Sequence, residues 1–343
     1  GDRIGLEGLT EGYFLGTGEG LIFEVRGHMH PRGFTVAYLR YAPYGALGRG
    51  VSRRGFVKVY DLEERWRLLR EGYPDYLRFD GAYGRVMQEV PDSKVKRIFD
   101  PKAGLMELKC RGTGDRLESK ALEMAEELAG AANVDLESIG VSGSILLGLH
   151  RRGSDLDLII YGVDNSLRVN RALKDLLSTG GDFKPYGRRG LLKLYRVRGL
   201  DRLISFEEFR DAEEEKTFQG LFGGSEYFIR FVKQPYEAGE SYGNPSYKPL
   251  GRGAFEAVVL DDSDAMFTPC RYLVEGWAQV GAGRIPIREV ASFRGRFCSQ
   301  AVRGDHVRGV GAVERVLWRD KPPYHRVIVG EDKGDFLIPG MVG

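Results

Sequence analysis

Two aspartates, Asp155 and Asp157, are the only charged residues in an apolar segment that ends at Tyr161. Aliphatic residues occupy both alternations of this segment, which is typical of a central β-strand covered on both faces. Because side chains alternate along a strand, we expect the two carboxylates on one face, about 6.6 Å apart along the strand. Like charges this close repel each other, so the sequence predicts a compensating cation. Hard oxygen ligands favour Mg²⁺ or Mn²⁺.

A turn of small residues precedes this strand. Ser142, Gly143 and Ser144 follow a short apolar strand, and residues 145–149 continue with the spacing of one or two helical turns. Such a turn at the start of a helix presents free backbone N–H groups to phosphate oxygens. Gly143 permits close approach, and Ser144 adds a hydroxyl donor. Together, the turn and the strand predict a nucleoside triphosphate beside a metal ion.

A structural interpretation of the aspartates is the alternative. Gly153, Ser154 and Asp155 form a good turn sequence, and aspartates at the entry of a strand can cap such a turn. Taken alone, the pair would favour this interpretation. Combined with Gly143 and Ser144, the metal-site interpretation is the stronger one.

The segment 139–162 resembles the signature of the nucleotidyltransferase superfamily that includes DNA polymerase beta. Gly143-Ser144 is followed by Gly148 and then by Ser154-Asp155-Leu156-Asp157-Leu158, which is the spacing of minimal nucleotidyltransferases. The order of elements over residues 115–233 is similar, and the whole chain resembles a family of archaeal predicted nucleotidyltransferases. The resemblance implies a glycine-serine loop that grips the triphosphate and an aspartate pair that binds two metal ions.

The resemblance also implies roles for individual residues. Asp155 and Asp157 are the expected catalytic and metal-binding residues. The expected nucleotide-binding residues are Ser142, Gly143, Ser144, Arg152 and Ser154. Minimal members often carry arginines after the glycine-serine pair, where this chain has Ile145 and Leu147, so Arg151 and Arg152 are the substitutes. The superfamily's third carboxylate has only weak candidates here, which are Glu256, Asp261 and Asp262.

Composition is typical of a water-soluble globular protein. The chain has 343 residues, of which 42% are hydrophobic and 29% charged, a length that favours about two domains. No apolar run is long enough to span a membrane, and the N-terminus lacks a secretory pattern, so we expect no membrane partner. The 3 cysteines suit neither a disulfide framework nor a zinc knuckle, and a cytoplasmic location is expected.

The net charge of +2 is almost balanced, but the basic residues are clustered. Arginine-rich segments interleaved with aromatic residues cover 49–58, 184–202 and 294–308. A basic and aromatic groove suits RNA or single strands, because cations meet phosphates and rings stack on bases. The alternative is that these segments are solvated strands of an arginine-rich protein.

The predicted fold class is α+β. We expect an N-terminal β region over 1–60, a helical connection over 61–114, a nucleotidyltransferase-type α/β layer over 115–234 and a C-terminal β barrel or sandwich over 235–343. Helices are expected over 61–71, 115–129, 165–180 and 205–219. Their expected N-caps are Asp61, Asp115, Asn165 or Ser166, and Ser205. Strands are expected over 20–27, 34–41, 55–60, 155–161, 191–197, 227–233, 255–260, 271–277, 289–294, 312–317 and 324–329.

The leading functional interpretation is a metal-dependent nucleotidyltransferase. It would move a nucleoside monophosphate from a nucleoside triphosphate such as ATP to a hydroxyl acceptor and release pyrophosphate. RNA is the expected acceptor, with a protein hydroxyl or a small molecule as alternatives. The competing class is an inactive member of the fold that binds RNA or a nucleotide. A further carboxylate within metal reach of Asp155 and Asp157 would favour the enzyme.

Overall fold

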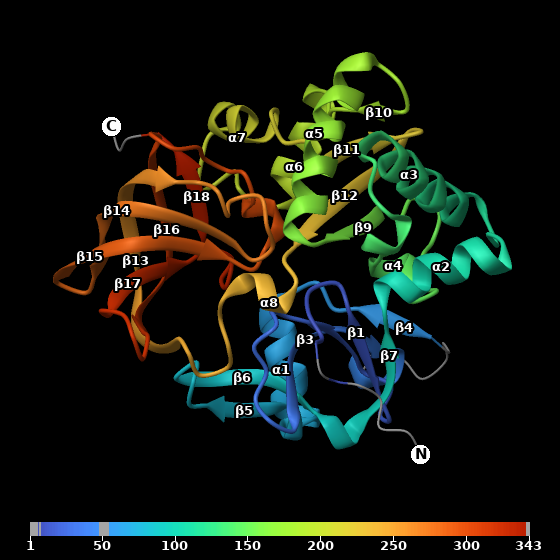
Figure 1. The fold of residues 1–343 in the computed structure, drawn as a ribbon. Coiled ribbons are helices and arrows are strands. Elements are labelled where there is room, and N and C mark those ends of the chain that lie inside the picture. The colour runs from blue at the N-terminus through green and yellow to red at the C-terminus, as the bar shows by residue number, and fades with distance from the viewer. Residues whose placement is uncertain (1–5, 7, 48–54, 341–343) are drawn as a thin grey trace.

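Three β-sheets formed by the described residues, 6, 8–47 and 55–340, surround a common centre in the computed structural model (Figure 1). Each sheet comes from a different part of the chain. The N-terminal sheet lies below the centre in Figure 1, an α/β layer lies above it, and the C-terminal sheet lies to the left. The predicted α+β class is confirmed. No helix within the described ranges is long and apolar enough to cross a membrane.

The N-terminal sheet has the strand order β5-β6-β3-β2-β1-β7, with β4 also paired to β3. Its strands are β1 (Phe14–Thr17), β2 (Ile22–Val25), β3 (Phe34–Pro43), β4 (Phe56–Lys58), β5 (Leu77–Asp80), β6 (Arg85–Pro91) and β7 (Val95–Phe99). Helix α1 (Leu62–Gly72) begins at the predicted N-cap, Asp61, whose side chain accepts a hydrogen bond from the Glu64 backbone N–H.

The prediction of a helical connection over 61–114 is therefore wrong in part. Strands β5, β6 and β7 fall inside it and belong to the N-terminal sheet. Prolines in the segment suggested irregular structure, but Pro91 ends β6 and Pro101 begins helix α2 (Pro101–Arg111). Proline is tolerated at both kinds of boundary, because no hydrogen bond inside an element is lost there.

The α/β layer contains a sheet of order β10-β11-β12-β9-β8. Its strands are β8 (Ile139–Val141), β9 (Leu156–Tyr161), β10 (Phe183–Lys184), β11 (Gln219–Phe222) and β12 (Ser225–Val232). Its helices are α3 (Arg116–Ala132), α4 (Gly143–Leu146), α5 (Val163–Thr179), α6 (Arg188–Val197) and α7 (Phe206–Glu213). The predicted caps at Asp115 for α3 and Ser205 for α7 are confirmed.

Two predictions in this layer are wrong. Residues 191–197 form part of helix α6 and not a strand, because Leu191 and Tyr195, four residues apart, bury one face of that helix. The helix expected over 205–219 ends at Glu213, and the following residues lead into β11. Helix α5 begins after Gly162, slightly before the expected Asn165 or Ser166.

The C-terminal sheet closes on itself. Its order is β13-β14-β15-β17-β16, and an additional pairing of β13 with β16 completes a barrel, which β18 extends from β16. The strands are β13 (Ser246–Asp261), β14 (Cys270–Val280), β15 (Gly283–Ser292), β16 (His306–Leu317), β17 (Tyr324–Ile328) and β18 (Phe336–Pro339). The predicted C-terminal β domain is confirmed. Because β13 pairs with β16 and closes the sheet, the domain is a barrel and not a sandwich. Helix α8 (Pro235–Ala238) lies in the link to it.

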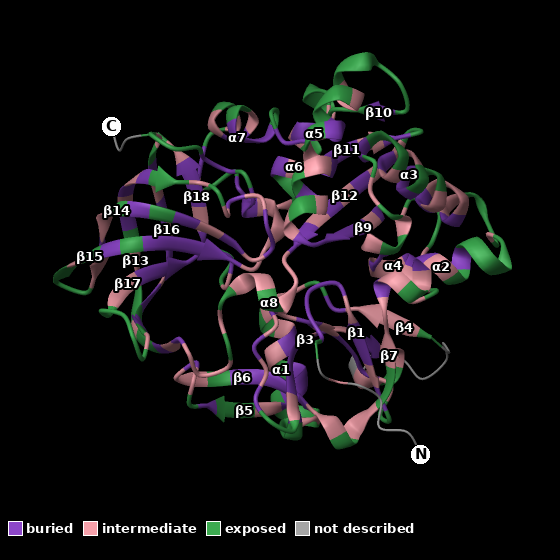
Figure 2. Ribbon diagram, viewed as in Figure 1, coloured by how far each residue is buried: buried purple, intermediate pink, exposed green. Residues whose placement is uncertain are grey.

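The three units pack against one another. One hydrophobic core includes Ile229 of the α/β layer and Phe255 of the barrel, and Figure 2 shows β9 as a largely buried strand. The N-terminal sheet meets the α/β layer at Gly12, where an added Cβ would lie 2.8 Å from the Ile159 side chain. The Tyr161 hydroxyl donates to the Glu11 carbonyl at 2.9 Å across the same contact.

Candidate functional site

Strand β9 turns Asp157 toward the N-terminal sheet. Its alternate residues, Leu156, Leu158 and Ile160, are fully buried in the core beside α3 and α5. Figure 1 shows β9 and β12 between these helices and the N-terminal sheet. Asp155 precedes β9 on the same alternation as Asp157, as the sequence predicted.

Both aspartates line a cavity of about 400 Å³ at the junction of the three units. The N-terminal sheet contributes Glu24, Arg40 and Lys58, and helix α1 contributes Arg65. The α/β layer contributes Gly143, Tyr186, Arg198, Glu226 and Arg230, and the loop after β15 contributes Phe293, Arg294 and Arg296. Lys58, Arg198 and Arg294 each belong to a different one of the three basic segments. The fold therefore brings these segments to one cavity.

The electrostatics of the aspartates are unfavourable without a cation. Loss of hydration in the cavity raises the pKa of Asp155 from 3.8 to about 6; the carboxylates of Asp157 and Glu226 add repulsion, and Lys58 and Lys193 oppose it. Burial also raises the pKa of Asp157, although Arg230 and Lys58 partly offset this. Neither carboxylate is in an ion pair of 4.0 Å or less with any residue in the described ranges.

Gly143 packs directly against Asp157. Its φ is +60°, and an added Cβ would lie 2.1 Å from Asp157 Oδ2. Only glycine fits this position, because a side chain would be both strained and in collision with the carboxylate. The sequence explained Gly143 by the approach of a phosphate, whereas the structure shows that the approach of Asp157 alone requires it.

The other predicted nucleotide-binding residues are less close to the cavity. Ser142 is fully buried, and its hydroxyl donates to the Gly12 carbonyl at 2.9 Å, so its side chain is engaged in the fold and its nucleotide-binding role stays a prediction. Ser144, partly exposed at the second position of α4, is not among the cavity's lining residues. Ser154 accepts a hydrogen bond from the Arg151 backbone at 2.9 Å in the turn before β9, and Arg152 is exposed there.

The weak candidates for a third carboxylate do not reach the site. Glu256 lies on barrel strand β13, Asp261 bonds the Ser263 backbone at 2.9 Å, and neither they nor Asp262 line the cavity. Glu226 does line it. Phe228 pairs with Asp157 in the parallel register of β12 and β9, which places Glu226 beside Asp155.

Glu226 already forms an ion pair, because the Nζ of Lys193 on α6 lies 2.6 Å from Glu226 Oε1. The described residues form no metal-binding group of three or more His, Cys, Asp or Glu side chains. Mg²⁺ commonly uses one or two protein carboxylates and takes its other ligands from water and substrate phosphates. The two aspartates supply carboxylate oxygens and have no cation partner within the described part of the chain, so they fit that requirement.

Several cationic side chains lie near Asp155 and Asp157, and their position there was not predicted from the sequence. Arg230 Nη1 lies 2.7 Å from Glu24 Oε1, and Arg40 Nε lies 2.8 Å from Glu24 Oε2. Lys58 has no such carboxylate partner among the described residues and lies 5.0 Å from the centre of the Tyr60 ring. The strand that carries Lys58 was predicted from the sequence. Its position near β9 was not, because it depends on how the N-terminal sheet packs against the α/β layer. Lys233, directly after β12, pairs with Asp264 at 2.6 Å.

The chain is thus an α+β protein whose charged cavity lies where an N-terminal sheet, an α/β layer and a barrel meet. It is 30% identical over 332 residues to the uncharacterized protein MJ1086 of Methanocaldococcus jannaschii, a match that covers 94% of this chain and 96% of that protein. The chain belongs to the same family as that archaeal protein. No protein-family model and no solved structure matches it.

Proposed function

We propose that the protein is a metal-dependent nucleotidyltransferase with its active site in the cavity beside β9. The observation that carries the proposal is the pair Asp155 and Asp157 in one cavity, two carboxylates without a cation partner among the described residues, with Asp157 packed on Gly143. The resemblance of this segment to minimal nucleotidyltransferases supports the same assignment.

The residues of the cavity have separate roles in this proposal. Asp155 and Asp157 would hold Mg²⁺ or Mn²⁺, which lowers the pKa of the acceptor hydroxyl and neutralises charge on the leaving group. Gly143 and Ser144 would orient the triphosphate, and Lys58 replaces Arg151 and Arg152 as its cationic partner. The acceptor oxygen bonds to the α-phosphorus while the bond from that phosphorus to the β-phosphate breaks. Pyrophosphate leaves, and the hydroxyl proton passes to solvent at the cavity mouth.

The acceptor is proposed to be an anionic hydroxyl compound. Its support is the cationic lining of the cavity, to which all three basic segments contribute. RNA, expected from those segments, is one such compound. Helix α6 offers further arginines outside the cavity, where a longer acceptor could extend.

Activity assays with carboxylate variants test the proposal. Asp155→Asn and Asp157→Asn should each abolish Mg²⁺-dependent release of pyrophosphate from labelled nucleoside triphosphates in the presence of total cellular RNA and small metabolites. Asp175→Asn, an exposed carboxylate on α5, is the matched control and should behave as the parent protein. Near-normal turnover in either site variant would disprove the two-aspartate mechanism. Nucleotide or RNA binding without turnover in the parent would favour the binding module instead.

A further inference from the structure

One wall of the cavity is built by the N-terminal unit and the barrel, and it carries positive charge in excess. Arg65 enters from α1, and Arg294 and Arg296 enter from the loop after β15. We call these three residues the arginine wall. Arg65 is only 3% exposed. Arg294 and Arg296 are half-buried, so the wall is largely withdrawn from solvent.

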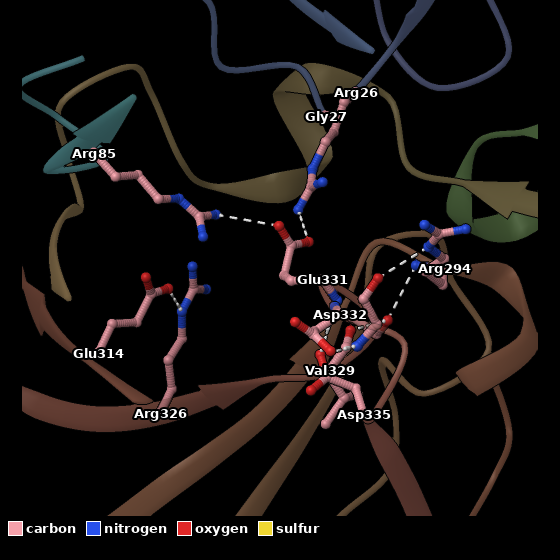
Figure 3. A network of polar contacts seen from close by, with 12 residues as sticks. Arg26, Gly27, Arg85, Arg294, Glu314, Arg326, Val329, Glu331, Asp332 and Asp335 are labelled. Carbon is pink, nitrogen blue, oxygen red and sulfur yellow. Dashed lines mark hydrogen bonds and ion pairs between the residues drawn. The ribbon is translucent and has the colours of Figure 1, made fainter. Parts of the chain in front are cut away.

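The carboxylates around this wall already form ion pairs with other cations. Each of them is shared between two cations: Glu24 pairs with Arg40 and Arg230, Glu213 with Arg198 and Lys216, and Glu331 with Arg26 and Arg85. Figure 3 shows Glu331 held between Arg26 and Arg85, away from Arg294. These pairs leave no carboxylate within 4.0 Å of the arginine wall among the described residues.

Neutral groups position the arginine wall without neutralising it. Arg65 Nε donates to the Val59 carbonyl at 2.8 Å, and Arg294 Nε donates to the Gly330 carbonyl at 3.0 Å. In Figure 3 the terminal nitrogens of Arg294 point away from the barrel loop. Arg296 lies over the Phe297 ring, and its buried Nε has no hydrogen-bond partner in the described structure.

The positive charge of Arg294 repels the guanidinium groups of Arg65 and Arg296 and lowers the pKa of each. Burial, and then the charges of Arg40 and Arg294, lower the pKa of Arg65 to about 9. Burial, and then the charges of Arg294 and Arg198, lower the pKa of Arg296 to about 10. Buried charges of one sign without counter-charges destabilise a fold. Such an arrangement is typical of a site whose ligand supplies the missing charge.

We propose that the arginine wall binds the phosphate monoester of a small phosphorylated alcohol, and that this compound is the acceptor of the nucleotidyl transfer. The inference rests on the proposed function. A phosphate monoester carries almost two negative charges, and planar guanidinium groups match its oxygens in pairs. A single phosphodiester of a nucleic acid chain carries only one. The cavity of about 400 Å³ also lies within the range of small-molecule sites.

The geometry gives the two ends of such an acceptor different tasks. Its phosphate would neutralise the wall and keep all its bonds, while its hydroxyl would extend across the cavity toward Asp157. The transfer then makes one bond from that hydroxyl oxygen to the α-phosphorus and breaks one bond to the leaving pyrophosphate. The energy of phosphate binding would serve to orient the hydroxyl.

Inorganic phosphate is the first probe, titrated into the full-length protein without metal or nucleotide. The parent protein should bind it, and Arg296→Met should bind it ten- to a hundred-fold more weakly, on the order expected for one charge-assisted hydrogen bond. Arg303→Met, an exposed arginine of the same basic segment, is the matched control. Asp157→Asn should retain phosphate binding. No binding to the parent, or equal binding to Arg296→Met, would overturn the proposal.

Thermal unfolding separates a binding role from a structural one. Among the described residues Arg296 has neither an ion pair nor a hydrogen-bond partner for its Nε, so Arg296→Met should unfold at the same temperature as the parent or a higher one. Added phosphate should raise the unfolding temperature of the parent and not that of the variant. A large fall in the variant's own unfolding temperature would make Arg296 structural and would contradict the proposal. Arg294→Met repeats the test at a second position.

Four further outcomes distinguish the substrates. If Arg296→Met loses affinity for the magnesium-triphosphate complex as strongly as for phosphate, the wall belongs to the triphosphate and the proposal fails. If RNA lacking terminal phosphates displaces inorganic phosphate and accepts label, the small acceptor is wrong. Phosphate binding by the wall with no Mg²⁺-dependent transfer to any acceptor, RNA included, would refute the acceptor role together with the proposed function. Transfer that is insensitive to Arg296→Met would refute this inference alone.

Discussion

The carboxylate of Asp155 links the candidate site to the stability of the fold. Its pKa is raised from 3.8 to about 6, so the folded protein holds this proton more tightly than the unfolded chain does. The resulting stability is complete below the unfolded value and is lost as the pH rises through the folded value. At neutral pH without metal, Asp155 therefore opposes folding.

The expected result is that metal-free Asp155→Asn unfolds at the same temperature as the parent at pH 7, or a higher one, and loses less stability than the parent between pH 4 and pH 6. Mg²⁺ should raise the unfolding temperature of the parent and not that of the variant. Calorimetry at several pH values measures both effects. A parent whose stability does not respond to Mg²⁺ at pH 7 would contradict a metal site at these aspartates.

Ser142 and Ser144 should respond in opposite ways to loss of the hydroxyl. Ser142→Ala leaves the Gly12 carbonyl without its donor and should cost about 1–3 kcal/mol of stability, with unchanged triphosphate affinity. Ser144→Ala should leave stability unchanged and weaken triphosphate binding by about 1–3 kcal/mol. Denaturant unfolding and triphosphate titration of both variants provide the comparison. If Ser144→Ala binds triphosphate as the parent does, the phosphates do not lie on this turn.

Gly143 is a poor place for a larger side chain in such a test. An added Cβ would lie 2.1 Å from Asp157 Oδ2, so even Gly143→Ala would move the carboxylate as well as disturb a bound phosphate. Its effect on activity would therefore combine two causes. The serine pair avoids this ambiguity.

At the scale of elements, the sequence predicted which side of a helix or strand is buried. It did not predict how the three units pack against one another. Helices α1 and α3 begin at the predicted caps, and β9 shows the expected burial on its helix-facing side. The segment 191–197 was expected to be a strand, whereas Leu191 and Tyr195, four residues apart, bury a helix face. The cavity could not be predicted, because residues as distant in sequence as Lys58 and Arg294 line it.

Helix α6 provides a test of the RNA acceptor. Its exposed arginines, Arg188, Arg189 and Arg196, lie outside the cavity, while Leu194 and the adjoining Arg198 line it. An RNA acceptor predicts that replacing the three arginines with glutamine weakens RNA binding, flattens its salt dependence and leaves triphosphate affinity unchanged. A small phosphorylated acceptor predicts full turnover in the same variant. Filter binding over a range of salt concentrations, with a parallel turnover assay, decides between them.

At the scale of the whole molecule, the cavity exists only while the three units remain docked. Glu331, in the barrel loop after β17, forms ion pairs with Arg26 and Arg85 of the N-terminal unit (Figure 3). The Arg26 guanidinium also lies 4.5 Å from the centre of the Tyr38 ring and 4.1 Å from that of Phe293, so it is clamped between the two units. The charge of Glu331 therefore supports both the docking and the cavity.

Glu331→Gln should lower the free energy of unfolding by about 3–5 kcal/mol, because it leaves Arg26, whose side chain is 12% exposed, without its counter-charge. Arg85→Met is the matched control. The Arg85–Glu331 pair is longer, at 3.7 Å, and the Arg85 side chain is 27% exposed, so its loss should cost no more than about 1 kcal/mol. Urea unfolding of both variants measures the difference. A Glu331→Gln variant as stable as Arg85→Met would show that this contact does not hold the units together.

Glu331 should also make the contact between the barrel and the N-terminal unit sensitive to acid. The positive charges of Arg26 and Arg85 outweigh burial and lower the pKa of Glu331 from 4.5 to about 2. The stability that it contributes is thus complete above the unfolded value of 4.5 and is lost as the pH falls toward 2. Glu331→Gln cannot lose that contribution, so the stability gap between parent and variant should narrow steadily below pH 4.5. A gap that stays constant down to pH 2 would mean that Glu331 is not held ionised by the two arginines, and the ion pairs would then not explain the docking of the barrel on the N-terminal unit.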